Sequence, residues 1–423
     1  MNEITPPAKL LPWAPERTGD ATPPAAPARR SGPGFAAATW LAVRLAWRQL
    51  WSEKARLASA IAGVLFACVL VFMQLGFRGA LFESATNLIG AMRGDLFLMH
   101  PLTTASFKPE PLPRVRAQQA LALPEVERAA PIYLAQASWR NPETGTRRAI
   151  QLIGVDTAAG VLDFPGLAPL VDALKRADTV AFDARSRPEF GAVAQLLAAR
   201  GGPIEVEIGN RRMDVVGLIE IGPSFGADGN VVLSEINFRR VVKERDVAAV
   251  DLVAIRLRPD ADIRQTQARL REILPPDVVV MTQAELRAHE RRYWEEATPI
   301  GFIFAFGSLM GLVVGMVIVY QILFSDIASH LKEYATLKAM GYSGFYLSRV
   351  VLGAALILAV TGFIPGLLLS FFLYDLVGSA TFLPLRLDFA MGASVFAMIF
   401  AMCAIAGLLA VRKLRDANPA DMF

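Results

Sequence analysis

Hydrophobic residues gather in four long runs, separated by segments of mixed composition. The runs cover residues 57–77, 300–324, 350–373 and 389–411, and none of them contains a charged residue. About 20 consecutive apolar residues are needed to cross the hydrocarbon core of a bilayer as a helix. Pro365 interrupts the third run, as transmembrane helices tolerate. The pattern therefore predicts four transmembrane helices.

The segment between the first two runs, residues 78–299, has a different pattern. Short apolar stretches alternate with turn residues and helical periodicity, and hairpin turns are predicted at 141–145 and at 209–210. Thr282 and Glu285 form a predicted capping box that opens a stalk helix leading into the second run. We expect an α-helical membrane protein with four transmembrane helices and a large extracytoplasmic mixed α/β domain inserted between helices 1 and 2.

Basic residues near the span ends predict the orientation. Lys and Arg residues lie before run one, between runs two and three, and after run four, whereas the loop at 374–388 carries one Arg and two Asp. Because positive charges favour the cytoplasmic side, both termini and residues 325–349 are predicted to be cytoplasmic. Segment 78–299 is then periplasmic, and the chain is a multi-pass protein of the inner (plasma) membrane.

Residues 325–349 are predicted to form a short amphipathic helix and a loop. Ser325 and Asp326 supply N-cap chemistry, and Gly341 follows the predicted helix end. The helix is a candidate docking element for a partner protein, and the alternative is an ordinary solvated loop. The candidate docking residues are Ile327, Leu331, Tyr334, Ala335, Leu337 and Gly341.

Two aromatic groups are predicted to anchor the chain at the membrane surface. Trp40, Trp47 and Trp51 share one face of a basic helix at 35–56, which suits a membrane interface; packing on another soluble domain is the alternative. Tyr293 and Trp294 lie just before run two and fit the aromatic belt of a bilayer.

The predicted division of the chain follows from these features. It comprises a disordered Pro/Ala-rich cytoplasmic tail 1–34, an interfacial helix 35–56, spans 57–77, 300–324, 350–373 and 389–411, the periplasmic domain with its stalk 78–299, the coupling segment 325–349, a short periplasmic loop 374–388 and a cytoplasmic tail 412–423.

The charge balance and the motifs of the chain exclude several classes of function. The 43 Lys and Arg against 39 Asp and Glu leave a net charge of +4, too small an excess to argue nucleic-acid binding. The chain contains no Walker phosphate loop and no His/Cys cluster with metal-ligand spacing, so we expect no cofactor, no metal and no ATPase activity in this chain. Residues 222–226 match the G-x-S-x-G pattern of a nucleophile elbow, which requires a helix directly after the serine. The sequence predicts a turn and another strand there. A glycine-rich loop is therefore the favoured interpretation, and a hydrolase that uses Ser224 is the alternative.

Several segments resemble a known family. Residues 332–341, KEYATLKAMG, resemble the segment after the second span of FtsX/MacB-like ABC transporter permeases, with Glu333, Leu337, Ala339 and Gly341 at matching positions. Residues 45–50 resemble the helix before the first span of that class. Residues 186–191 and 224–230 look like segments of its DevC subfamily, and the whole resemblance covers residues 40–423.

This resemblance implies a permease that forms a homodimer in membrane lipid and pairs with a separate ABC ATPase subunit, whose docking site is the coupling segment. A periplasmic membrane-fusion protein and a TolC-type outer-membrane channel would complete a DevC-like exporter. The alternative within the same fold is an FtsX/LolC-like mechanotransmission protein for lipoprotein release or cell-wall hydrolase activation.

Overall fold

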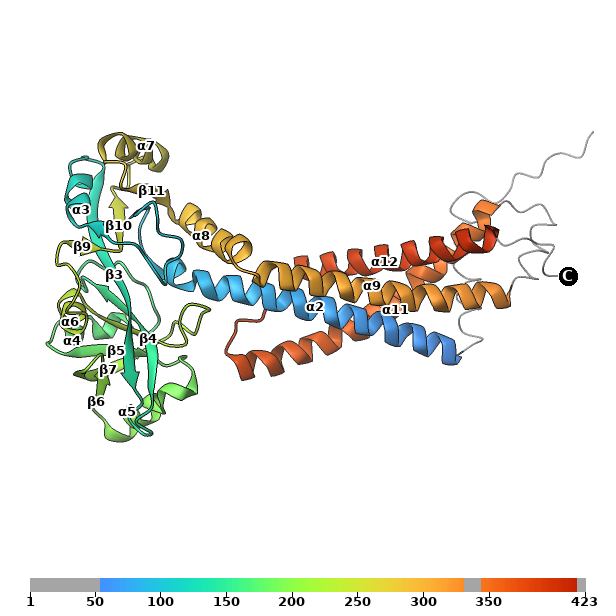
Figure 1. The fold of residues 1–423 in the computed structure, drawn as a ribbon, viewed down its shortest axis with the longest axis horizontal. Coiled ribbons are helices and arrows are strands. Elements are labelled where there is room, and N and C mark those ends of the chain that lie inside the picture. The colour runs from blue at the N-terminus through green and yellow to red at the C-terminus, as the bar shows by residue number, and fades with distance from the viewer. Residues whose placement is uncertain (1–53, 331–343, 417–423) are drawn as a thin grey trace, which may run out of the picture.

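A bundle of four long helices carries a compact head (Figure 1). The structure is a computed structural model that describes residues 54–330 and 344–416. The bundle consists of α2 (Lys54–Ala91), α9 (Ile300–Ser329), α11 (Gly344–Thr381) and α12 (Phe389–Asp416). All four helices are long and apolar enough to cross a membrane, and each contains one of the apolar runs found in the sequence.

The helices extend beyond the apolar runs. Helix α2 continues past Phe77 to Ala91, α9 continues through Ser325 to Ser329, and α11 ends at Thr381. The predicted N-cap at Ser325 and Asp326 is therefore wrong, because both residues lie inside α9. The end of an apolar run marks the edge of the hydrocarbon core of the bilayer. A helix can continue beyond that edge, because its backbone hydrogen bonds do not depend on apolar side chains.

Small residues allow the bundle helices to approach closely. Helix α2 packs against α9 and α11, and α12 packs against the same two helices. A Cβ atom added at Gly362 of α11 would lie 2.5 Å from the Cβ of Val64 in α2, and one added at Gly366 would lie 2.9 Å from Cys68. Glycines at this spacing let helix backbones meet within a membrane. The two cysteines, Cys68 and Cys403, are buried in this bundle as free thiols, as expected for core residues.

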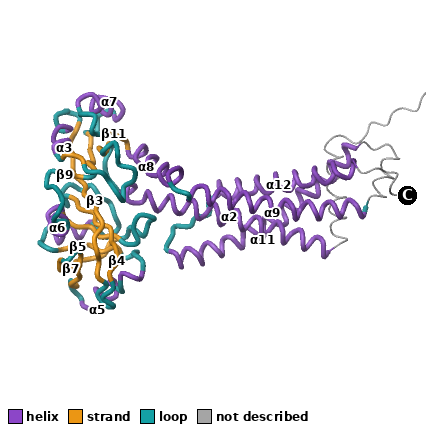
Figure 2. The backbone as a smooth tube through the Cα atoms, in the orientation of Figure 1, coloured by secondary structure: helices purple, strands orange, loops and turns teal. Residues whose placement is uncertain are grey.

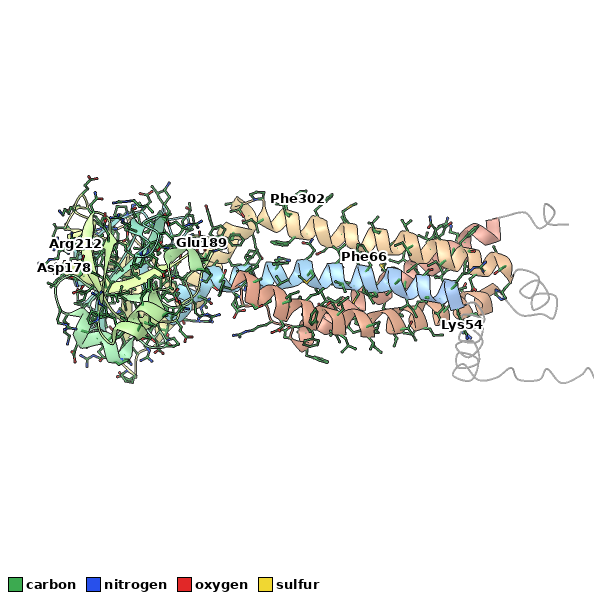
Figure 3. The ribbon with its side chains drawn as sticks, turned by 90° about the horizontal axis from the view of Figure 1, so that it is seen from below. Lys54, Phe66, Asp178, Glu189, Arg212 and Phe302 are labelled. Carbon is green, nitrogen blue, oxygen red and sulfur yellow. The ribbon has the colours of Figure 1, made fainter. Side chains whose placement is uncertain are left out.

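The outer surface of the bundle is apolar. Phe66 of α2 and Phe302 of α9 point outward and are 52% and 70% exposed (Figure 3). A bundle whose exposed side chains are large and hydrophobic fits a hydrocarbon surrounding.

The head domain, residues 92–292, joins α2 to α9 and contains every strand of the described structure (Figure 2). Its strands are β1 (Leu96–Met99), β2 (Leu112–Pro113), β3 (Val126–Arg140), β4 (Arg147–Val155), β5 (Thr179–Asp183), β6 (Ile204–Ile208), β7 (Arg211–Ile219), β8 (Asn230–Ser234), β9 (Ala249–Val250), β10 (Leu252–Leu257) and β11 (Val279–Thr282). Its helical segments are α3 (Val115–Ala120), η1 (Ala168–Leu170), α4 (Val171–Leu174), η2 (Pro188–Phe190), α5 (Val193–Arg200), α6 (Glu235–Val241), α7 (Ile263–Ile273) and α8 (Gln283–Arg292).

The main sheet has nine strands in the order β11-β1-β10-β3-β4-β8-β5-β7-β6. Strand β6 also pairs with β3, so β3, β4, β8, β5, β7 and β6 close into a small barrel, and β10, β1 and β11 extend from it as an open sheet. Both predicted hairpins, β3–β4 and β6–β7, are confirmed. Gly209 and Asn210 have φ of 52° and 62°, the left-handed values that a tight hairpin turn requires.

Both faces of the sheet are buried. Along β1, Leu96 and Leu98 belong to one hydrophobic cluster, and Phe97 and Met99 belong to another. Successive side chains of a strand point to opposite faces, so the sheet separates two cores. Fully buried Trp139 lies in the first core, where its Nε1 donates a hydrogen bond of 3.0 Å to the carbonyl oxygen of Phe190.

Two helical regions of the head are short and interrupted. Residues 168–174 form only η1 and α4, and residues 188–200 are divided between η2 and α5. Gly191 separates this second pair at φ 99°, which a regular helix cannot accommodate. The G-x-S-x-G segment joins β7 to β8 without a helix, so it lacks the strand–turn–helix setting of a nucleophile elbow.

Candidate functional site at the junction of head and bundle

Helix α2 passes without a break from the bundle into the head. Its 38 residues correspond to about 57 Å at 1.5 Å per residue, whereas the hydrocarbon core is about 30 Å thick. Val64 and Phe72 lie in the core of the bundle, and Ile89 lies in a core of the head. Helix α2 therefore connects the core of the bundle to a core of the head without a break.

The second connection between head and bundle is the stalk, formed by α8. Its capping box is confirmed: the Thr282 hydroxyl accepts a hydrogen bond from the Glu285 amide, and the Glu285 carboxylate accepts one from the Thr282 amide. Gln283, the first residue of α8, donates hydrogen bonds of 3.0 and 2.8 Å to the carbonyl oxygens of Ile89 and Met92. The start of the stalk is thus fixed to the end of α2.

A cluster of aromatic residues lies where the stalk meets the bundle. Between α8 and α9 the chain forms a π-helical segment, η3 (Tyr293–Ala297). Trp294 is 7% exposed, and its ring lies 5.5 Å from that of Phe107 and 5.2 Å from that of Phe225. We call Phe82, Phe107, Phe225, Tyr293 and Trp294 the aromatic joint; they come from α2, two head loops and η3.

Glu290 connects this joint to the head. Its side chain is buried and accepts hydrogen bonds from the Ser106 amide at 2.7 Å and from Trp294 Nε1 at 3.0 Å. Burial raises the pKa of this carboxyl group, and the two hydrogen bonds oppose the rise. One residue earlier, His289 Nε2 lies 2.9 Å from the carbonyl oxygen of Thr103. The stalk is therefore fastened to the loop that carries Phe107.

Asp183 holds the other head loop of the joint. This fully buried carboxylate accepts hydrogen bonds from the amides of Ile221 and Gly222 and from Asn230 Nδ2, each at 2.9 Å. Burial raises its pKa, while these hydrogen bonds favour the ionised form. Because Gly222 has φ of 91°, its position favours glycine. The loop between β7 and β8 is thereby held where Phe225 contacts Trp294.

Ion pairs add contacts between α2 and its neighbours. Arg78 pairs with Glu295 of η3 at 3.0 Å, and Glu83 pairs with Arg386 of the α11–α12 loop at 3.6 Å. All four side chains are substantially exposed, so each pair contributes about 0–1 kcal/mol. These pairs therefore add little to the stability of the fold, and their main effect is on how η3 and the α11–α12 loop are oriented against α2.

The structure places the predicted anchors and docking residues as follows. Trp294, predicted as an interfacial anchor, is 7% exposed and packs in the aromatic joint, and Tyr293 lies beside it and is partly exposed. Ile327 is 1% exposed inside the bundle, because α9 continues through it, and it is not part of a free docking face. The other docking residues, Leu331, Tyr334, Ala335, Leu337 and Gly341, and the anchors Trp40, Trp47 and Trp51 lie outside the described residues.

Ser224 and the ionisable side chains of the described residues were the candidates for catalysis or metal binding. The Ser224 hydroxyl accepts a hydrogen bond of 3.2 Å from the Ala227 amide within its own turn. Within residues 54–330 and 344–416, no group of three or more His, Cys, Asp or Glu side chains is placed to hold a metal ion. The arrangement suits transmission of movement between the bundle and the head.

Two family comparisons match this architecture. Residues 57–273, more than half of the chain, match the MacB-like periplasmic core domain, and residues 305–419 match the FtsX-like permease C-terminal family. The search of curated proteins gives no match.

Solved structures similar to this chain include three domains. The periplasmic region of MacB from Actinobacillus actinomycetemcomitans is 12% identical, with TM-score 0.34, covering 47% of this chain and 93% of that one. The extracellular domain of the noncanonic ABC-type transporter YknZ from Gram-positive bacteria is 13% identical, with TM-score 0.32, covering 45% and 99%. A domain of a putative permease from Porphyromonas gingivalis is 16% identical, with TM-score 0.27, covering 44% and 85%.

Proposed function

The chain belongs to the FtsX/MacB-like class of ABC transporter permeases, and we propose that it is the permease subunit of an exporter that transmits ATP-driven movement from the membrane to its head domain. The family is a permease component, so ATP hydrolysis is the task of a partner subunit. The observation that carries the proposal is the continuity of α2, which has buried residues in the core of the bundle and in a core of the head.

The aromatic joint supports the same proposal. It links α2 and the stalk to two head loops through stacked rings and through the buried carboxylate of Glu290. Packed interiors transmit displacement because they contain few voids. Movement of α2 or α9 in the membrane would therefore turn the head as a unit.

The coupling segment is the proposed site of ATPase docking. Residues 325–349 connect the second and third spans and carry basic residues that favour the cytoplasmic side. In this proposal both termini are cytoplasmic and the head is periplasmic. The docking face consists of Leu331, Tyr334, Ala335 and Leu337, with Gly341 at its end.

The head is proposed to act on a periplasmic assembly. Segments 186–191 and 224–230 resemble the DevC subfamily, which favours a homodimer working with a membrane-fusion protein and a TolC-type outer-membrane channel. The four apolar runs contain no charged residue, which favours movement of the head over passage of cargo between the spans.

Co-purification in mild detergent tests this function. An exporter should retain an ABC ATPase together with a membrane-fusion protein. Recovery of the ATPase with a lipoprotein-binding partner or a secreted cell-wall hydrolase would reject export and support the mechanotransmission alternative. Absence of any ATPase subunit, under conditions where the chain stays folded, would reject both.

A further inference from the structure

Helices α2 and α11 lie side by side in the bundle, run in the same direction and meet at regular intervals (Figure 1). A Cβ atom added at Gly362 of α11 would lie 2.5 Å from the Val64 Cβ, and one added at Gly366 would lie 2.9 Å from the Cys68 Cβ. From the first pair to the second, each helix advances by four residues. Such rows of residues four apart are the ridges through which helices commonly pack.

The same row of α11 ends in a large residue. Ser370 is fully buried one turn after Gly366, and Tyr374, one turn further on, is 4% exposed. The Tyr374 ring fills the space beside Gly76 of α2, where an added Cβ atom would overlap its hydroxyl and ring carbons. The glycine therefore belongs to α11 at the first two contacts and to α2 at this one.

A hydrogen bond fixes the position of the tyrosine. Its hydroxyl donates to the carbonyl oxygen of Phe72, one turn before Gly76, and lies 3.5 Å from Met391 Sδ of α12. A hydroxyl without a partner is costly in an apolar surrounding, so the bond favours this one position of the ring. We call the packing of Tyr374 against Gly76 and its hydrogen bond to Phe72 the Tyr374 contact.

The Tyr374 contact is satisfied in one register of the two helices. The row of α2 that faces it comprises Val64, Cys68, Phe72, Gly76 and Ala80. A shift by four residues, about 6 Å, would bring Tyr374 opposite Phe72 or Ala80. Neither position leaves room for the ring, because even a Cβ atom in place of Gly76 overlaps it. Gly362 and Gly366 have no side chains that would oppose such a shift.

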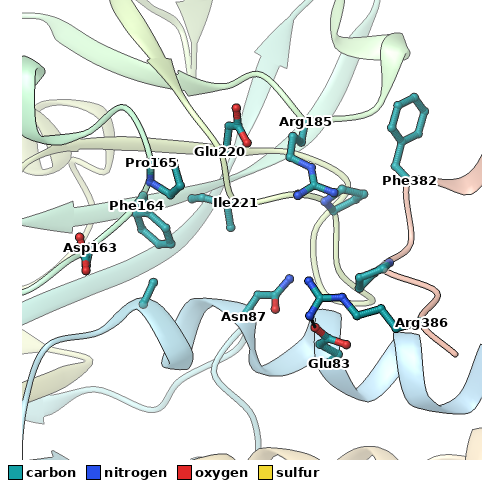
Figure 4. Close-up of a pocket in the computed structure, with 14 residues that line it drawn as sticks. Glu83, Asn87, Asp163, Phe164, Pro165, Arg185, Glu220, Ile221, Phe382 and Arg386 are labelled. Carbon is teal, nitrogen blue, oxygen red and sulfur yellow. Dashed lines mark ion pairs between the residues drawn. The ribbon is translucent and has the colours of Figure 1, made fainter. Parts of the chain in front are cut away.

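A second contact between α2 and the outer end of α11 is weak. After α11 the chain returns to α2 in the α11–α12 loop, where Arg386 pairs with Glu83 at 3.6 Å (Figure 4). The two side chains are 78% and 42% exposed, and exposed pairs of this kind contribute little to stability. The register at this end of the bundle therefore depends chiefly on the Tyr374 contact.

We propose that the Tyr374 contact holds α2 and α11 in one resting register, and that it must open before α11 can move relative to α2. Helix α11 begins at Gly344, within the coupling segment, whereas α2 continues into the head. A displacement of the coupling segment by an ATPase would therefore meet this contact before it changed the position of α11 relative to the head. Only that step rests on the proposed function, because the resting register is a property of the folded chain.

Electron–electron double resonance on the full-length protein in detergent, without an ATPase, tests the resting register. Spin labels at Ser59→Cys of α2 and Ser379→Cys of α11 occupy exposed positions, and the two native cysteines are buried. The labels lie about 33 Å apart along the bundle, since the register places Ser379 level with Leu81. Dilution with unlabelled chain restricts the measurement to distances within one chain.

We expect one narrow distance distribution in the wild-type protein. In Tyr374→Ala it should become about twofold broader, because registers about 6 Å away become accessible. Tyr374→Phe keeps the ring and loses the hydrogen bond, so its distribution should be intermediate. In folded, monodisperse protein, a wild-type distribution in both tyrosine variants would overturn the proposal, and Tyr374→Phe alone decides if Tyr374→Ala does not fold.

Matched variants separate this role from general packing. Tyr320→Ala should keep the wild-type distribution, because Tyr320 of α9 stacks on Phe324 of its own helix, with ring centroids 5.9 Å apart. Gly76→Ala should broaden the distribution as Tyr374→Ala does. Gly79→Ala, also in α2, should leave it unchanged, because nothing lies within 4 Å of an added Cβ atom there. Equal broadening in the two glycine variants would overturn the assignment to the Tyr374 contact.

The opening of the contact is tested in the complex with the ATPase subunit. ATP should shift the distance between the labels at residues 59 and 379, as α11 leaves its resting register. An unchanged distance in a complex whose head moves on ATP binding would overturn the opening step. A failure to find any ATPase subunit would reject the proposed function instead, and the measurement on the permease alone would still decide the resting register.

Discussion

The carboxylate of Glu290 joins two parts of the chain that are 184 residues apart. It accepts hydrogen bonds from the Ser106 amide in the head and from Trp294 Nε1 in η3. A buried acid normally costs stability, and here its bonds fasten the stalk to the head. At the scale of single residues, the junction therefore depends on a group whose protonation responds to pH.

Stability should decrease with rising pH through Glu290. Burial raises its folded-state pKa above the ordinary 4.5, so the folded state binds more protons than the unfolded state between the two values. The contribution of this group is full below about pH 4.5 and is lost as pH rises through the folded-state pKa. Gln cannot titrate, so the stability advantage of wild type over Glu290→Gln should shrink as pH rises.

Thermal unfolding of the full-length protein in detergent across this pH range measures the difference. Glu296→Gln, at an exposed position two residues after Trp294, is the control and should follow wild type at every pH. If the stability advantage of wild type over Glu290→Gln instead grew with rising pH, the predicted direction of the pH dependence would be wrong.

Single-residue roles at the junction were only partly predictable from the sequence. Tyr293 and Trp294 have the composition of a membrane anchor, yet Trp294 contacts Phe107 and Phe225, which are distant in sequence. Asp183 and Glu290 look like ordinary surface acids until the fold brings amide donors around them. The spacing of Glu290 and Trp294, one helical turn apart, was the one local signal that could have linked them.

At the scale of elements, the contact of α11 with α2 depends on glycine. A Cβ atom at Gly362 would lie 2.5 Å from the Val64 Cβ, whereas nothing lies within 4 Å of one at Gly392 in α12. Gly362→Ala should therefore destabilise the protein by about 1–3 kcal/mol, and Gly392→Ala by no more than about 0.5 kcal/mol. Thermal unfolding in detergent compares the two variants, and equal loss in both would contradict the close approach.

The coupling segment provides a second prediction at this scale. Burying a Leu-sized side chain contributes about 1.5–3 kcal/mol, and a factor of ten in affinity corresponds to about 1.4 kcal/mol. Leu331→Asp should thus weaken ATPase binding at least about tenfold, while Lys332→Ala, on the opposite face, should have a small effect. Co-purification of the ATPase and stimulation of its activity, at matched membrane amounts, measure both variants. Loss in Lys332→Ala alone would place the docking face on the other side, and no effect in either would favour a solvated loop.

Elements were predictable where local chemistry defines them. The hairpin at Gly209-Asn210, the capping box at Thr282 and the four apolar runs all follow from adjacent residues. The sequence predicted that a new helix begins at Ser325 and Asp326, because both residue types favour an N-cap. In the structure both residues lie inside α9, whose backbone hydrogen bonds continue to Ser329. Barrel closure through β3 and β6 was not predictable, because it depends on pairing between residues near 140 and 207.

The whole molecule is elongated, with the helical bundle at one end and the head at the other (Figure 1). Its predicted orientation can be tested with single cysteines introduced at Asp228 of the head and Lys332 of the coupling segment. Native Cys68 and Cys403 are buried and should give little background. A membrane-impermeant thiol reagent should label the two positions from opposite sides of the membrane, as the distribution of basic residues predicts. Labelling of both from one side would reject the four-span arrangement.

The central claim is that ATP-driven movement passes from the bundle to the head through α2 and the aromatic joint that packs against it. It is tested by electron–electron double resonance on the complex with its ATPase subunit, between spin labels at Asp228→Cys in the head and Ser379→Cys in α11. The account predicts that the distance distribution shifts when ATP binds and that Trp294→Ala reduces the shift, because α2 then remains as the main connection between the bundle and the head. Leu102→Ala, in a head loop and 73% exposed, is the control and should retain it. An unchanged distribution with and without ATP in the wild-type complex, or a full shift in Trp294→Ala, would contradict the account.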